Sequence, residues 1–170
     1  IIRGTPLLVQ MYVIFFGLPK IGIIIEPFLA AVIVFSVNEG AYVAETIRAA
    51  LESVPKGQIE AGYCVGMSYR QIMKRIVLPK ALSTDFPPLS NSVIALMKDT
   101  SLAANITVTE MFMATQRIVA VTYEPLILYL EVGFIYLMFS TVLTKLQRVG
   151  EKYLNTDEIR REKRCLRWKM

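Results

Sequence analysis

Apolar residues along the chain fall into four long runs separated by polar segments: Leu7–Leu18, Phe28 to about Ser53, Pro79–Met97 and Pro125–Leu146. A helix needs about 20 predominantly apolar residues to cross a bilayer, and the last three runs come near that length. The first run is too short alone. Because the chain opens abruptly at Ile1, we expect it to be the latter part of a span that begins upstream. The pattern predicts an all-α protein with four crossings.

The third run is unlike a lipid-facing helix. It holds Asp85, Asn91 and several serines, and Pro87-Pro88 is expected to interrupt it. Polar groups at membrane depth are costly unless they face a bundle interior or a water-filled path, so this helix should be central in its assembly. The mixed segment Lys98–Tyr123 follows, and we expect a helix over Thr107–Arg117 near the outer surface.

The longest polar segment, Pro55–Pro79, separates the second and third runs and is called the elbow below. Proline cannot continue a helix interior, so Pro55 should stop the preceding helix and Pro79 should mark the exit. Gln58–Val65 predicts a first short helix, which Gly66 closes in the left-handed conformation. Ser68 and Gln71 have capping-box spacing and predict a second helix, whose apolar face is Tyr69, Ile72, Met73 and Ile76.

The pattern alone leaves two interpretations of the elbow open. It could dock against a partner protein, or it could be an amphipathic helix that lies on the membrane surface.

Composition and charge placement agree with a membrane protein. Hydrophobic residues make up 54% of the chain and its mean hydropathy is +0.47. The net charge is +5, and 16 of the 19 Lys and Arg lie before the first run, around the elbow and from Lys145, at the end of the last run, onward. The positive-inside rule then places the elbow and the C-terminus in the cytoplasm. We expect one membrane domain, residues 1–155, and a charged cytoplasmic tail, residues 156–170.

Catalytic chemistry has little support in the sequence. The chain has no histidine, the commonest metal ligand and general base. Its two cysteines, Cys64 and Cys165, match no metal or redox spacing, and it contains no G-x-x-x-x-G-K-[ST] phosphate loop. We predict no catalytic residue, no metal site and no cofactor, and therefore no enzyme.

The elbow resembles the EAA loop of permease subunits in ATP-binding-cassette (ABC) importers. The resemblance rests on Glu60-Ala61, on Gly66 five residues after Ala61, and on Ile76-x-Leu78-Pro79, with Gly62 where alanine is usual. Three further stretches look like permeases of the polar amino acid uptake family: Arg3–Gln10, Gly40–Glu45 and Lys98–Leu102. The similarity extends from Arg3 to about Asn155 and favours docking over a surface helix.

This resemblance implies a multi-span helical permease of the bacterial cytoplasmic membrane. Complete subunits of the family have five spans, so the first would be missing here. They pair as homodimers or heterodimers, and their EAA loops sit in clefts of cytoplasmic ATPase subunits, which bind the ATP. An extracellular binding protein delivers the amino acid.

The resemblance also implies roles for elbow residues. Glu60 would cap or anchor the first helix, Gly66 would permit the bend, and the apolar face of the second helix would fill the ATPase cleft. The expected coupling residues are Glu60, Ala61, Gly66, Tyr69, Ile72, Met73, Ile76, Leu78 and Pro79.

A path for a zwitterionic amino acid needs an acceptor for the ammonium and donors for the carboxylate. Asp99 could supply the acceptor, and Thr100, Ser101 and Asn91 could supply hydrogen bonds, with Glu131 as a second charged candidate. Asp99 could instead sit at the interface, and Glu131 could pair within the bundle. Residues 99–112 and 124–137 look closest to cystine-type permeases, although glutamine, arginine or another polar amino acid remains possible.

Three other function classes are alternatives. An ion-coupled secondary transporter would carry its coupling site on repeated halves, and no repeat is seen. A membrane-embedded enzyme would need a catalytic constellation. A scaffold without transport would have no use for a polar third run.

Overall fold

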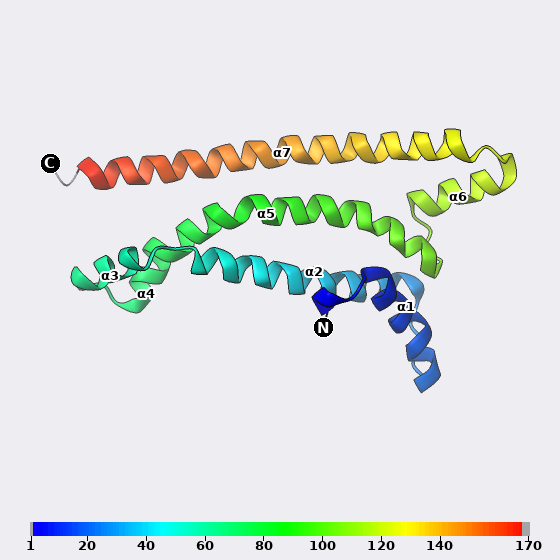
Figure 1. Ribbon diagram of the computed structural model, residues 1–170, viewed down its shortest axis with the longest axis horizontal. Helices are drawn as coiled ribbons and strands as arrows, with labels where there is room; N and C mark the ends of the chain where they lie inside the picture. The colour runs from blue at the N-terminus through cyan, green and yellow to red at the C-terminus, as the bar shows by residue number, and fades with distance from the viewer. Residues whose placement is uncertain (1, 168–170) are drawn as a thin grey trace. The chain divides into compact units, whose positions relative to one another are not determined.

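Helices follow one another along the whole of residues 2–167, the part of the chain that this computed structural model describes, with side-chain surroundings described as far as Tyr153. Figure 1 shows them in order. They are η1 (Ile2–Gly4), α1 (Leu7–Gly17), η2 (Leu18–Ile21), α2 (Pro27–Glu52), α3 (Lys56–Cys64), α4 (Tyr69–Ile72), the π-helix η3 (Met73–Val77), α5 (Leu78–Asp99), η4 (Thr100–Ile106), α6 (Met111–Thr122) and α7 (Pro125–Arg167).

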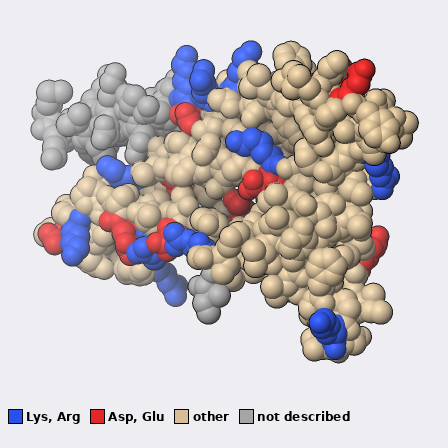
Figure 2. All heavy atoms as spheres, turned by 45° about the vertical axis from the view of Figure 1, so that its right-hand side comes forward, with Lys and Arg blue, Asp and Glu red and all other residues tan. Residues whose placement is uncertain are grey.

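The second and last predicted spans are each one helix. Helix α2 has 26 residues and α7 has 43, and α7 continues past Leu146 because the charged segment there is rich in good helix formers and has no proline. Among the described residues, two helices are long and apolar enough to cross a membrane: Pro27–Glu52 and Pro125–Tyr153. Most of their large apolar side chains are exposed, and Figure 2 shows broad surface areas without charged side chains.

Neither the first nor the third predicted span is both long enough and apolar enough to cross a membrane by the same criterion. Helix α1 has only 11 residues, and α5 has 22 but carries too many polar side chains. The predicted break at Pro87-Pro88 was wrong, since α5 continues through both prolines. Proline is tolerated within membrane helices where neighbouring groups satisfy the carbonyls that it frees.

The helix predicted over Thr107–Arg117 is displaced along the chain. Thr107 has a left-handed conformation, with φ 66°, and ends η4 instead of starting a helix. Glu110 then acts as the N-cap of α6: its carboxylate accepts hydrogen bonds from the backbone N–H of Phe112 at 2.7 Å and of Met113 at 2.5 Å. An N-cap carboxylate satisfies donors that a helix start leaves open, so α6 begins at Met111.

The chain divides into two compact units, Ile1–Tyr42 with Ser92–Leu143, and Val43–Asn91 with Thr144–Met170. In the first unit, α1 packs on the start of α2 and on η4. Ala30 and Ala31 of α2 are buried there, and small residues of this kind let helix backbones approach closely. The buried residues of this core are Met11, Ala30, Ala31, Val34, Ala103 and Ile106.

In the second unit, the elbow folds onto the end of α2 and the start of α5. The buried residues of this second core are Ala50, Val54, Ile72, Val77 and Ala81. Helix α7 also passes close to α5 in this unit, because a Cβ atom added at Gly150 would lie 2.5 Å from Cζ of Phe86. The side chain of Gln147 donates to the carbonyl of Pro87 at 3.4 Å beside that contact.

Candidate functional site

The first arm of the elbow is α3, which ends at Gly66 as the sequence predicts. Gly66 has φ 78°. Its N–H donates to the carbonyl of Tyr63 at 2.9 Å, and the N–H of Met67 donates to that of Gly62 at 3.0 Å. These two bonds make a Schellman motif, which satisfies carbonyls at a helix C-terminus. The chain therefore reverses at Gly66 with its backbone groups paired.

The second arm starts at Ser68, as predicted. The N–H of Ser68 donates to Oε1 of Gln71 at 2.9 Å, and its carbonyl accepts the N–H of Ile72 at 3.0 Å. Ser68 and Gln71 thus form a capping box. This arrangement fixes the start of α4 directly after the bend.

The end of the second arm differs from the prediction. The π-helix Met73–Val77 follows α4, and the N–H of Leu78 donates to the carbonyl of Met73, five residues earlier. Helix α5 then begins at Leu78 without a break. Pro79 is the second residue of α5, so the elbow ends near where the sequence predicts, but no break separates it from α5. The elbow is continuous with α5.

The apolar face predicted for docking is largely turned inward. Ile72 is 1% exposed and packs with Ala50 and Val54, and Met73 and Ile76 are partly buried against the same cluster. Ile72 is therefore part of the chain's own core, and Met73 and Ile76 lie against it; that this face fills a partner's cleft stays a prediction. Tyr69 remains at the surface, 63% exposed.

The exposed side chains near the bend form a different surface, which we name the apex. It comprises Tyr63, Val65 and Tyr69, which are 52%, 75% and 63% exposed. Large apolar side chains at the tip of a helix pair are typical of a surface that another protein covers. Sequence reasoning missed Tyr63 and Val65 because they lie on α3 and at its end, outside the predicted face.

The other predicted coupling residues take various positions. Glu60 lies within α3, whose N-cap is Pro55 without a side-chain cap, so it does not cap this helix as predicted. Glu60, Ala61 and Leu78 are all exposed. Gly62 is buried, and a Cβ added there would lie 2.9 Å from Cγ1 of Ile72. The glycine that departs from the family pattern is thus the place where the two arms meet.

A pocket in the first unit lies beside the start of η4. Its volume is about 520 Å³, within the range of roughly 300–1,000 Å³ that is usual for small-molecule sites. Helices α5, η4, α6 and α7 all contribute to it. The lining residues are Lys98, Ser101, Phe112, Tyr129, Val132, Gly133 and Tyr136.

Aromatic and charged groups surround this pocket. The rings of Phe112 and Tyr129 are stacked with centroids 5.8 Å apart. The hydroxyl of Tyr136 donates to Oε2 of Glu110 at 3.3 Å. With Lys98 in the lining, the pocket has a cation and, through Tyr136, a nearby carboxylate, the two charges that a zwitterion would need.

The structure brings only one of the predicted path residues into this pocket. Ser101 lines it, with its hydroxyl donating to the carbonyl of Lys98 at 2.8 Å. The Thr100 hydroxyl donates to the carbonyl of Met97 at 2.7 Å, and Asp99 is exposed beside it. Glu131 is exposed on α7 next to Leu130 and Phe134, outside the pocket. Asn91 is exposed and belongs to the second unit.

Sequence reasoning missed most of the pocket. The stripe Tyr129, Val132, Gly133 and Tyr136 has the i, i+3, i+4, i+7 spacing of one helix face, a signal that could have found it and that leaves Glu131 off that face. Asp85 was noted as polar but not as a site. It is 3% exposed, and its Oδ1 has no hydrogen-bond partner among the described residues.

Comparison with known protein families shows which family the chain belongs to. The family model for the binding-protein-dependent transport system inner membrane component matches residues 1–154. The chain belongs to this family. It is therefore an inner membrane protein, and the predicted all-α permease fold is confirmed.

Relatives within the family include several amino acid permeases. The L-cystine transport system permease TcyB of Bacillus subtilis (strain 168) is 48% identical over 155 residues, which cover 91% of this chain and 66% of the relative. The glutamine transport system permease GlnP of Escherichia coli (strain K12) is 40% identical over 154 residues, covering 89% and 70%. The chain thus spans about two thirds of the length of the relatives that it matches.

Solved structures agree with this membership. A crystal structure of an amino acid ABC transporter with histidines matches with a TM-score of 0.84 and 34% identity, covering 89% of this chain and 71% of that one. The MetNI methionine ABC transporter in inward-facing conformations matches with a TM-score of 0.64 at 18% identity, covering 87% and 70%, which shows the fold alone. The prediction of an amino acid ABC permease is confirmed at the level of the family, whose permease subunits are not themselves enzymes.

Proposed function

We propose that this permease carries a polar amino acid, with L-cystine as the first candidate, across the cytoplasmic membrane in an ATP-driven importer. Family membership carries the proposal. Two relatives named as L-cystine permeases, at 48% and 38% identity, support the choice of substrate. The working assembly would contain an ATPase that binds ATP, a second permease subunit and an extracellular solute-binding protein.

Coupling would pass through the elbow in the cytoplasm. The apex, Tyr63, Val65 and Tyr69, would enter the groove of the ATPase, while Ile72 holds the elbow to the core at the end of α2. Because the elbow continues into α5 through a π-helix, a push on the apex would reach α5 without a flexible joint. Glu60, Ala61 and Leu78 are exposed and would border the contact.

The pocket beside η4 would be one binding site along the amino acid path. The Lys98 ammonium and the Ser101 hydroxyl would bind the substrate carboxylate. The Glu110 carboxylate, which already accepts a hydrogen bond from the Tyr136 hydroxyl, would attract the substrate ammonium. The Phe112–Tyr129 pair would pack against the apolar part of the side chain. Asp99 and Thr100 would stand at the edge of this route.

The test is uptake by the full chain, purified from its native membranes with its bound ATPase and reconstituted in liposomes. We expect ATP-dependent accumulation of labelled cystine that exceeds accumulation of glutamine or arginine. Tyr69→Ala should lower both uptake and stimulated ATP hydrolysis about tenfold or more, because burying such a side chain at an interface is worth roughly 1.5–3 kcal/mol. Tyr123→Ala is the matched control, since Tyr123 directly follows α6 and is 85% exposed.

Different failures separate the parts of the proposal. Uptake of glutamine in place of cystine would overturn the substrate and keep the transporter. Equal uptake by Tyr69→Ala and Tyr123→Ala would overturn the apex as the coupling surface. Absence of ATP-dependent uptake of every polar amino acid would overturn the function.

A further inference from the structure

The pocket beside η4 is lined by a glycine that helix packing within the chain does not explain. Gly133 lies inside α7, and glycine in a helix interior is less favourable than alanine. In membrane helices, glycine commonly allows a neighbouring helix to approach closely. Gly62 and Gly150 show such an approach, since an added Cβ would lie 2.9 Å from Cγ1 of Ile72 and 2.5 Å from Cζ of Phe86, respectively. At Gly133 nothing packs within 4 Å of the added Cβ.

The position of Gly133 around α7 places it at the exposed edge of the pocket, which we call the mouth. Tyr129 and Tyr136 lie four residues before and three residues after it and also line the pocket, so the three share one helix face. Val132, about 100° further around the helix, is 6% exposed and forms the inner side. Gly133 itself is exposed. A side chain at this position would project beside the two tyrosines and narrow the mouth.

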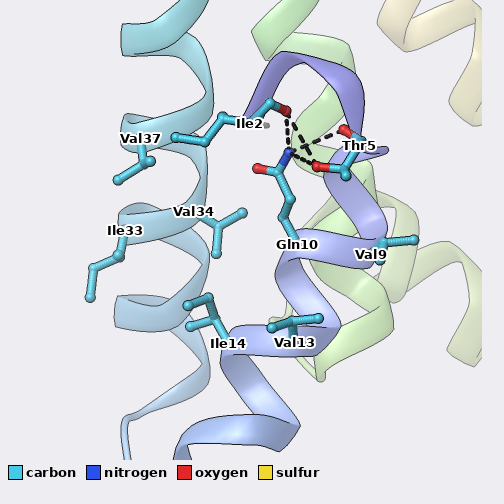
Figure 3. A pocket seen from close by; sticks show the side chains of 9 residues that line it. All are labelled: Ile2, Thr5, Val9, Gln10, Val13, Ile14, Ile33, Val34 and Val37. Atoms are coloured by element: carbon cyan, nitrogen blue, oxygen red, sulfur yellow. Dashed lines mark hydrogen bonds between the residues drawn. The ribbon is translucent and has the colours of Figure 1, made fainter.

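A second pocket of the same unit lacks the charged groups that an amino acid needs. This groove between α1 and α2 has a volume of about 320 Å³, and its polar lining residues are Thr5 and Gln10. Nε2 of Gln10 donates to Oγ1 of Thr5 at 2.9 Å, as Figure 3 shows, and its Oε1 accepts from Nδ2 of Asn38 at 3.1 Å. None of its lining residues is charged. The pocket beside η4 instead has Lys98 in its lining and Glu110 nearby.

Polar and aromatic groups of the pocket beside η4 lie on either side of Gly133 along α7. The Tyr136 hydroxyl donates to Oε2 of Glu110 at 3.3 Å, and Tyr129 stacks on Phe112. Seven residues separate Tyr129 from Tyr136, about 10 Å at the rise of a helix. The two Cα atoms that a disulfide joins are about 5.5–6 Å apart. An amino acid held beside Glu110 therefore has room to extend past Gly133 to the aromatic pair.

We propose that Gly133 is a specificity-determining residue, which keeps the mouth wide enough for an amino acid with a long side chain. The inference rests on the proposed function, because it takes the pocket to be part of the amino acid path. Long side chains on a helix point back toward its N-terminus, here toward Tyr129. Gly133→Leu would therefore cover the approach to the Phe112–Tyr129 pair and leave Lys98 accessible. A long amino acid would lose contacts that a short one does not make.

The experiment measures uptake kinetics of the full chain, reconstituted with its ATPase, for labelled L-cystine and the shorter L-glutamine. Gly133→Leu should raise KM for cystine about tenfold or more, because one methylene in a pocket already changes discrimination about tenfold. The kcat for cystine should stay within about twofold and KM for glutamine within about threefold, since the groups that bind a short amino acid are kept. Gly133→Ala should shift KM for cystine in the same direction by less.

Gly17→Leu is the matched control. Gly17 ends α1, is exposed, and has nothing within 4 Å of an added Cβ, but it lies outside this pocket. The control variant should change neither KM. The unfolding temperature of each variant shows whether it is folded.

The possible failures are distinguishable. With wild-type uptake intact, an unchanged KM for cystine in Gly133→Leu would overturn this inference alone. A loss of kcat shared by both amino acids would also overturn it, because it would mean that Gly133 packs against another subunit. Wild-type uptake of glutamine without cystine would contradict a mouth kept wide for a long side chain. Absence of wild-type uptake of every polar amino acid would overturn the proposed function, and this inference with it.

Discussion

Gly62 is the residue at which the two arms of the elbow approach most closely. A Cβ atom there would lie 2.9 Å from Cγ1 and 3.2 Å from Cδ1 of Ile72. Ile72 is 1% exposed and cannot swing into solvent. We expect Gly62→Ala to lower the free energy of unfolding by about 1 kcal/mol, because overpacking costs roughly 1–3 kcal/mol and exceeds the helix-propensity gain of about 1 kcal/mol.

The sign of this effect should reverse when the neighbour is removed. In an Ile72→Ala background, the alanine at position 62 would fill part of the hole, so Gly62→Ala should become stabilising, with a coupling energy of about 1–2 kcal/mol. Gly57→Ala, at a position in α3 with no atom within 4 Å of its added Cβ, should be neutral or stabilising in both backgrounds. Thermal unfolding in detergent measures all these variants. A Gly62→Ala effect of the same sign in both backgrounds would contradict the close approach.

Asp85 is a second residue at which a substitution should change the free energy of unfolding. It is 3% exposed, and Oδ1 lacks a hydrogen-bond partner among the described residues. Burying an unpaired polar group costs roughly 1–3 kcal/mol by mutational measurements, so Asp85→Leu should raise the free energy of unfolding by about that amount. Asp99→Leu, at an exposed site, is the control and should change it little. A destabilised Asp85→Leu would mean that this carboxyl has a partner which compensates its burial.

Such a stabilised variant would also report on function. Residues that are costly for stability are often kept for activity. A more stable Asp85→Leu protein that no longer transports would place Asp85 on the transport mechanism, and an active one would leave it a tolerated polar residue.

At the scale of elements, the π-helix accounts for the burial of Val77 in the same core as Ile72. Ile72 and Val77 are both buried in one core although they are five residues apart. That spacing does not stack residues in an α-helix, but the i to i+5 bonding of a π-helix aligns them. The prediction assumed α-helical spacing throughout, and so it left Val77 out of the apolar face that contains Ile72 and Ile76.

Deletion of Lys74 tests this explanation. It would leave Ile72 and Val77 four residues apart, the spacing that an α-helix stacks, so the core would be kept without the π-helix. We expect the unfolding temperature to change by less than about 4 °C, equivalent to about 1 kcal/mol in a chain of this size. Deletion of Lys80 is the control, because it turns every later residue of α5 by about 100° relative to Ile72 and Val77 while the π-helix remains, and it should destabilise by considerably more.

Short motifs predicted correctly those helix ends that depend only on neighbouring residues. Gly66 terminates α3 because glycine readily adopts the left-handed conformation that ends the helix. Ser68 and Gln71 start α4 because their own side chain and backbone groups form the capping box. The pocket beside η4 was beyond such reasoning, because Ser101, Phe112 and Tyr136 come from three helices whose approach depends on packing. Only Ser101 was named in advance, since its neighbours in sequence resembled a family motif.

At the scale of the whole molecule, the main feature is the large apolar surface, which needs a lipid or protein environment to cover it. Large exposed aliphatic and aromatic residues line α2 and α7, far more than a soluble monomer tolerates. Membership of an inner membrane family accounts for them as lipid or subunit contacts. The charges then predict how the molecule is oriented, since Lys and Arg concentrate around the elbow and in the C-terminal half of α7.

The side of the membrane on which the elbow lies is therefore the last prediction, and a native residue can report it. Cys64 ends α3, is exposed, and lies two residues before the bend. In a Cys165→Ser variant, a membrane-impermeant maleimide should label Cys64 in inside-out vesicles and leave it unlabelled in intact cells, because the positive-inside rule places the elbow in the cytoplasm. A cysteine at Val121, in a variant without Cys64, should give the opposite result, since α6 is expected on the outer side. Labelling of Cys64 from outside would remove the apex from any cytoplasmic ATPase, whatever the substrate of the transporter proves to be.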